Sequence, residues 1–324
     1  MSIICLAIVF VGVGDLAQSQ TAATKTPTAK TGDLRTDDLK SADDKNPRQP
    51  DLAYGAYQRG WYLTAFDLAL PRANLGDPAA QTLIAELYDK GLGIAQDRKE
   101  ATAWYEIAAN AGNREAQFSF AIKLLNGKYI KKDHDRAMKL MEQAANAGHS
   151  VAMFNYAQQV INENPGSKGF AIALPYLEKA AGAGVVDAYY ALSQIHAGGL
   201  GRTAPDEKSA RFWLIRAARG GVDTAQIELA IQLANGKGGE KNEKSAAAWF
   251  RRAAFSGNVI AQNRLARMLA QGMGVKANAA EAAKWYILAR RAGHVDFWLD
   301  DFLKSISQQD RAIAMDAANH WRSR

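Results

Sequence analysis

The chain has 324 residues, of which 48% are hydrophobic and 23% are charged, so it is long enough for two globular domains. The formal net charge is +7, but Lys and Arg are interleaved with Asp and Glu, and no helical face carries a run of one sign. We therefore expect no nucleic-acid-binding surface. The single cysteine is Cys5, so the chain that follows it has no thiol.

The first residues have the features of an export signal. Ile3 to Val13 form an apolar run, and the small-residue site Ala17-Gln18-Ser19 follows it. Such a run suits a signal peptide and is too short to span a bilayer. We predict a signal peptide at 1–19, a periplasmic or secreted protein, and no stable membrane insertion after cleavage. No Lys or Arg precedes the run, so a membrane anchor, or a cytoplasmic protein with a misassigned start, stays open as an alternative.

Residues 20–50 contain no aromatic side chain and are dominated by Thr, Lys, Asp and Pro. A segment of this composition cannot bury enough apolar area to offset the entropy of ordering, so it is predicted to be a disordered linker. Residues 51–77 are predicted to form a shortened helical hairpin that turns at Gly60. Pro71 is expected to kink its second helix or to end it early.

An internal repeat covers residues 78–294. An alanine near the start of each repeat recurs at Ala80, Ala116, Ala152, Ala188, Ala225 and Ala261, at intervals of 36, 36, 36, 37 and 36 residues. We call the distance from this alanine the offset. A large residue stands at offset 4 in every repeat and a small one at offset 5, which places both on one helical face with the alanine. The predicted repeats are 78–113, 114–149, 150–185, 186–222, 223–258 and 259–294.

A second helix is predicted in each repeat. Glycines such as Gly91 end the first helix, because glycine adopts the left-handed conformation without a steric penalty. Asp97 with Glu100, and Asn278 with Glu281, have capping-box spacing, and Pro205 suits a first helical turn. An aromatic or long apolar pair follows in the second helix, and we expect the tryptophans of these pairs to pack between helices: Trp104, Trp213, Trp249 and Trp285.

The pattern AQ…LY…GLG…D…A…WY…AA…G over residues 80–112 resembles the Sel-one-like repeat, a relative of the tetratricopeptide repeat. Repeats 5 and 6 resemble it well, and repeats 2 and 4 do so adequately. The third repeat departs most, since INENPGSKG stands in place of the glycine loop and Pro175 lies inside the second helix. The resemblance implies an all-α fold, an α-solenoid with a right-handed superhelix of helix-turn-helix repeats. It is also typical of adaptors, scaffolds and regulators.

Residues 295–324 are predicted to form a two-helix C-terminal cap. Leu299 falls on the apolar face of the first helix, and Ser307 has the spacing of an N-cap for the second, which would bury Ile313. Phe297 and Trp298 are expected to cover the open end of the last repeat, with partner binding as the alternative.

The histidines are spread over different repeats without metal-ligand spacing, and the glycine loops lack the Gly-Lys-Ser or Gly-Lys-Thr of a phosphate loop. We therefore predict no catalytic, cofactor or metal site. The preferred function is an exported, non-catalytic module that binds a protein or peptide and acts as a scaffold or regulator. An envelope enzyme, a cell-wall or polysaccharide-binding factor, and a cytoplasmic adaptor remain alternatives.

The family resemblance places offsets 2, 3 and 6 of the first helices on the concave face. In the four middle repeats offsets 2 and 6 form an apolar row with polar ends, which suits an extended peptide or a partner helix. The opposing hypothesis, which we slightly favour, is that the rings at offset 2 pack against the next repeat. The residues of this candidate partner-binding row are Phe118, Ile122, Phe154, Gln158, Tyr190, Gln194, Ile227 and Ile231.

Overall fold

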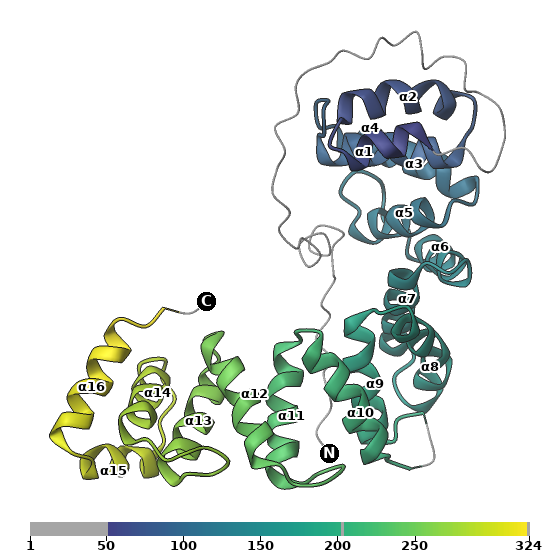
Figure 1. Cartoon of the computed structure of the whole chain (residues 1–324). Coiled ribbons are helices and arrows are strands. Elements are labelled where there is room, and N and C mark those ends of the chain that lie inside the picture. Colours follow the sequence, from purple (N-terminus) through teal and green to yellow (C-terminus); the bar gives the residue numbers. More distant parts are fainter. Residues whose placement is uncertain (1–50, 202–203, 323–324) are drawn as a thin grey trace. The chain divides into compact units, whose positions relative to one another are not determined.

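The structure is a computed structural model that describes residues 51–201 and 204–322. The predicted signal peptide and linker lie outside the described residues. All regular secondary structure in the described part is α-helical, which confirms the predicted fold class (Figure 1). The helices fall into two compact units, the first ending at Ala147 and the second beginning at Gly148. We call them the N-terminal unit and the C-terminal unit.

The N-terminal unit holds the opening hairpin and two repeats. Each of its helices packs against the next one along the chain. Their bounds are α1 (Leu52–Gln58), α2 (Tyr62–Asn74), α3 (Pro78–Lys90), α4 (Arg98–Asn110), α5 (Arg114–Asn126) and α6 (His134–Asn146).

The C-terminal unit holds four repeats and two closing helices. The repeats again form hairpins of consecutive helices, and α16 packs on α14. The bounds are α7 (Ser150–Glu163), α8 (Ser167–Gly182), α9 (Val186–Gly198), α10 (Glu207–Arg219), α11 (Asp223–Asn235), α12 (Glu243–Phe255), α13 (Val259–Gln271), α14 (Ala279–Arg291), α15 (Phe297–Ser305) and α16 (Gln308–Asn319).

Side chains cap the helices largely where the sequence predicts. Asp97 accepts hydrogen bonds from the backbone N–H groups of Lys99 and Glu100, and Asn278 accepts one from Glu281. The predicted place of Pro205 is wrong: Asp206 caps α10 by accepting from the Ser209 N–H, so the proline precedes the cap and lies outside the helix. Each N-cap satisfies a backbone donor that the helix leaves unpaired.

The prolines do not end their helices. Pro71 lies inside α2, which continues to Asn74, so the prediction of an early end is wrong. Pro175 lies inside α8, which has 16 residues. In this third repeat the glycine loop is absent, and α7 instead extends to Glu163.

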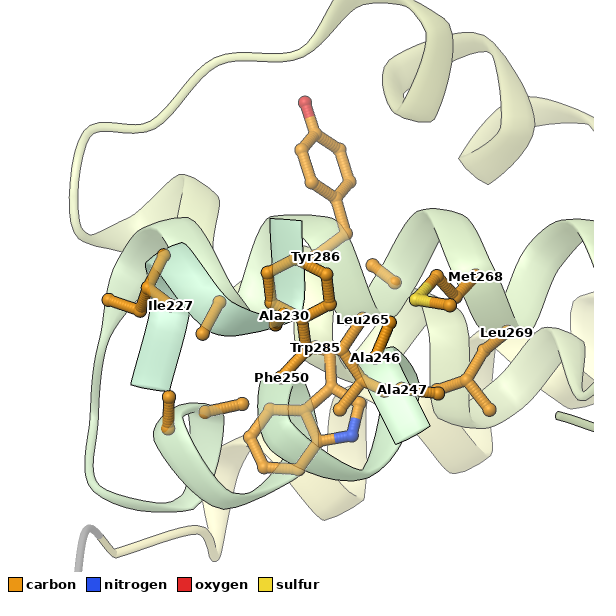
Figure 2. Packing of buried hydrophobic residues seen from close by; sticks show 14 of the residues in the cluster. Ile227, Ala230, Ala246, Ala247, Phe250, Leu265, Met268, Leu269, Trp285 and Tyr286 are labelled. Atoms are coloured by element: carbon orange, nitrogen blue, oxygen red, sulfur yellow. The ribbon is translucent and has the colours of Figure 1, made fainter. Parts of the chain in front are cut away.

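The core is made of alanines at helix crossings and of large residues between them. The six repeat alanines are all buried, and their small side chains let neighbouring helices approach closely. Figure 2 shows Trp285 and Phe250 beside Leu265 and the alanines of α12, with the Tyr286 hydroxyl directed away from them.

Burial within the aromatic pairs differs from the expectation. Of the four tryptophans predicted to be packed, only Trp285 is fully buried, whereas Trp104, Trp213 and Trp249 are half-buried. The core position is the second member of each pair. It is occupied by Tyr105, Met141, Leu177, Leu214, Phe250 and Tyr286, all of them buried.

A second glycine in the loop, at offset 13, brings repeats together. Gly274 has a φ of +66°, and a Cβ at this position would lie 2.3 Å from the carbonyl of Glu243, the first residue of α12. Gly238 is placed likewise, since its Cβ would lie 2.5 Å from the carbonyl oxygen of Glu207 at the start of α10. The loop backbone therefore packs directly on the second helix of the preceding repeat, where no side chain fits.

The closing helices agree with the prediction in part. Ser307 caps α16 by accepting from the Asp310 N–H, and Leu299 is fully buried. However, α16 buries Ala314 and Ala318 while Ile313 is exposed. Small residues are needed on the buried face because α16 packs closely on α14.

Candidate functional site

The predicted partner-binding row is less accessible than the sequence suggests. At offset 2, Phe118, Phe154 and Ile227 are 3%, 7% and 8% exposed, and only Tyr190 is half-buried. This burial favours the packing hypothesis for the offset-2 side chains. Their binding role remains a prediction.

The offset-6 side chains are the accessible part of the row. Ile122 belongs to the N-terminal unit and is half-buried. In the C-terminal unit Gln158 and Gln194 are half-buried and Ile231 is exposed. A partner approaching the first helices therefore meets offset 6 before offset 2.

A groove of about 720 Å³ lies in the N-terminal unit, and Ile122 lines it. The first helices α3 and α5 contribute most of its wall, including Glu86 and Asp89 from α3 and Ser119 from α5. Tyr105 of α4 is buried and also faces the groove. A concave site that mixes apolar, hydrogen-bonding and charged groups is what ligand recognition requires.

Two lysines neutralise the α3 carboxylates of the groove. Lys123 Nζ lies 2.8 Å from Asp89 Oδ1 and 5.3 Å from the centre of the Tyr105 ring. Lys90 Nζ binds Glu86, which also accepts a hydrogen bond of 2.7 Å from the Tyr57 hydroxyl. One ion pair thus joins α5 to α3, and the other holds Glu86 of α3 together with Lys90 and Tyr57.

Tyr105 of the groove and Tyr57, which binds the groove residue Glu86, are held in their neutral form. Burial, followed by the hydrogen bond to Glu86, raises the pKa of Tyr57 to about 12. Burial also raises the pKa of Tyr105 well above its ordinary value. Neither hydroxyl ionises near neutral pH, so both stay hydrogen-bond donors.

One end of the groove is cationic and aromatic. Arg98, Lys128 and the 38% exposed Tyr129 line it. The Arg98 guanidinium makes a 3.5 Å contact with the Tyr129 hydroxyl, and Lys128 Nζ lies 5.4 Å from the ring centre. The contact with Arg98, supported by Lys128, lowers the pKa of Tyr129. The candidate residues chosen from the sequence did not include these three.

In the C-terminal unit the same helix face carries a polar network. Tyr190 Oη and Gln194 Nε2 both donate to the Glu228 carboxylate at 2.8 Å. Burial is the main cause that raises the pKa of Tyr190 to about 12, and the hydrogen bond to Glu228 adds to it. Two residues of the predicted row are thus brought together by a carboxylate that the sequence analysis did not single out.

Asp296 joins the closing helices to the last repeat. Its carboxylate accepts two 2.7 Å hydrogen bonds from Arg267 and one of 3.0 Å from Asn263, and it caps α15 by accepting from the Leu299 N–H. Burial would raise the pKa of Asp296, but these donors lower it to about 2. The carboxylate has a structural role, because it caps α15 and joins it to Arg267 and Asn263 of α13.

Phe297 and Trp298 differ from their predicted role as a cover for the last repeat. Phe297 is 82% exposed, so it covers nothing within the described residues. Trp298 is 40% exposed, stacks on Phe302 and lies 5.2 Å from the Arg267 guanidinium. The cover is provided instead by Leu299 and by the alanines of α16.

The described residues provide neither a cluster of metal ligands nor a membrane-spanning helix. No group of three His, Cys, Asp or Glu side chains within 51–201 and 204–322 is arranged to hold a metal ion. Among the helices in these ranges, none combines the length and apolar character needed to cross a lipid bilayer.

Consecutive helices pair in hairpins whose first helices each bury an alanine at the same position, and this arrangement defines an α-solenoid. The Sel1 repeat model matches residues 78–113, 115–149, 186–222, 224–258 and 259–294. The chain belongs to the Sel1 repeat family, whose members are generally non-catalytic and bind protein partners. The match leaves out 150–185, the repeat without a glycine loop.

Solved structures agree with this assignment. A Sel1 repeat protein from Oxalobacter formigenes is 27% identical, with a TM-score of 0.61 over 74% of this chain and 97% of that chain. A protective antigen of uropathogenic Escherichia coli with the same repeat fold is 22% identical, with a TM-score of 0.51 over 79% of this chain and 63% of that chain. None of the curated proteins matches the chain.

Proposed function

We propose that this Sel1 repeat protein is an exported, non-catalytic scaffold or regulator that binds a protein or peptide through the groove on its first helices. The observation that carries the proposal is the groove itself. It is lined by side chains of two successive first helices, of which Ile122 is apolar and half-buried while Ser119 and Asn126 can hydrogen-bond. The mixed lining suits a peptide, which presents side chains and backbone polar groups together.

Site-specific photo-crosslinking in the native host tests this function. A photoreactive amino acid at Ile122 is expected to give a crosslinked partner. Ile107 provides the matched control, because it belongs to the same unit, is 47% exposed and does not line the groove. Equal crosslinking from both positions, or none from position 122, would contradict binding in the groove.

A polysaccharide-binding role is the second candidate, and one cluster in the C-terminal unit supports it. Tyr189 and Trp213 stack with ring centres 5.9 Å apart, and Phe212 beside them is exposed. However, the Arg216 guanidinium lies 4.8 Å from the Tyr189 ring centre and 5.5 Å from that of Trp213, where a sugar would stack. Co-sedimentation with insoluble peptidoglycan tests this role, and retention that is lost in Trp213→Ala would favour it over peptide binding.

A further inference from the structure

Two of the six repeats lack glycine at offset 13: the third, which has Pro165 and no glycine loop, and the second. Gly93, Gly201, Gly238 and Gly274 occupy this position in four repeats, and each lies where a Cβ would meet the backbone of the preceding second helix. The second repeat has Tyr129 there. Its side chain cannot fit such a contact, and instead it stands 38% exposed at the rim of the groove. A residue that departs from the packing rule of its fold and stands at the rim of a groove is a candidate for function.

The cations beside Tyr129 differ from the other two cations of the groove. Lys90 and Lys123 are bound to Glu86 and Asp89. Arg98 and Lys128 have Tyr129 as their neighbour, and no described carboxylate lies within ion-pairing distance of either. Asp89 also acts electrostatically on Arg98, but its carboxylate is already bound to Lys123. This end of the groove therefore carries two cations that form no ion pair within the described residues.

The groove is polar along its length. Its lining positions run from Thr82 to Lys90 on α3 and from Glu115 to Asn126 on α5, which correspond to about 12 and 16 Å at a helical rise of about 1.5 Å per residue. The carboxylates of Glu86 and Glu115 belong to earlier turns, whereas the cationic rim lies beyond the helix ends. An extended chain of about four or five residues has this length.

We propose that this groove binds an extended acidic segment of a partner protein, whose carboxylates contact Arg98 and Lys128 while an apolar side chain packs on Tyr129 and Ile122. The inference rests on the proposed function and adds the chemistry of the partner. Charge complementarity selects carboxylates at the rim. A peptide suits this groove better than a nucleic acid, because the lining also offers the apolar Ile122 to a side chain and the amide of Asn126 to a peptide backbone.

A peptide-display selection on the full chain tests this inference. The probe is a library of random decapeptides, followed by fluorescence anisotropy with the most enriched peptide. The test variant is Arg98→Glu/Lys128→Glu. The matched control is Lys99→Glu/Lys131→Glu, which changes the same net charge in the same helix turn and the same loop, at exposed positions that do not line the groove. Circular dichroism verifies that both variants keep the parent melting temperature.

We expect the parent protein to select peptides rich in Asp and Glu with one apolar residue. Affinity should fall at least tenfold in the test variant and less than threefold in the control. Equal losses in both variants would overturn the inference, because they would indicate general surface charge. Peptides without acidic enrichment whose binding is lost in Ile122→Glu would overturn the acidic preference and retain the proposed function. If no peptide is enriched, the inference fails, and crosslinking at position 122 decides the proposed function separately.

Discussion

Replacing Asp296 by Ala should release the closing helices from the last repeat. The substitution removes an N-cap of α15, which contributes about 1 kcal/mol. It also removes the charge-assisted hydrogen bonds from Arg267 and Asn263, and such bonds contribute about 1.5 to 3 kcal/mol each when buried. We use the lower end, because the Arg267 side chain is 33% exposed and recovers water. Counting only the cap and the buried bond from Asn263, and discounting the two bonds from the partly exposed Arg267, we expect a loss of about 2 to 3 kcal/mol in the free energy of opening α15.

Hydrogen exchange measured by mass spectrometry on a peptide covering 297–305 reads this loss locally. A change of 2 to 3 kcal/mol corresponds to roughly 30- to 150-fold faster exchange. Asp301→Ala serves as the control, because Asp301 is 76% exposed and pairs only with Lys304. An exchange rate in Asp296→Ala equal to that of the control would refute the structural role assigned to Asp296.

Three further predictions concern acid stability, the core and the leader. The pKa of Asp296 is about 2 in the folded protein and about 3.9 in the unfolded chain. Its contribution of about 1 to 2 kcal/mol to the free energy of unfolding is therefore present above pH 4 and is lost as the pH falls toward 2. In Asp296→Asn, the hydrogen exchange of α15 should depend less on pH in this window. Phe250→Ala should lower the stability by about 3 to 4 kcal/mol and Trp249→Ala by about 1 to 2 kcal/mol in thermal unfolding, because only Phe250 is buried; equal effects would contradict the burial order. Protein from the native host should begin near Gln20 by mass spectrometry, and an intact Met1 would argue against export.

The sequence predicted the helices well because their signals are local. Asp97, Asn278 and Ser307 cap helices where their spacing indicates, and Gly91 ends α3 with a φ of +67°. Each of these depends on a few neighbouring residues, which the printed sequence shows directly. The repeat register follows from the same local patterns, copied at a constant interval.

Burial at the ambiguous positions could not be predicted, because it depends on neighbouring helices. In Trp249-Phe250 both residues are large and aromatic, and only packing shows that Phe250 faces the core. The groove did leave a signal in the sequence. Aligning the repeats at offset 13 shows Tyr129 where four repeats have glycine, with Lys128 beside it in the sequence, whereas the place of Arg98 needed the structure.

The glycine contact at offset 13 bears on how such a chain diversifies. At Gly274 the loop backbone contacts the backbone of the preceding helix. This contact therefore depends little on which side chains the neighbouring repeat carries. Repeats of the same register can therefore pack on one another at this contact without matched side chains, and their half-exposed positions can change independently. Tyr129 marks the opposite case, in which a loop without the offset-13 glycine contact leaves an exposed aromatic ring at the rim of the groove.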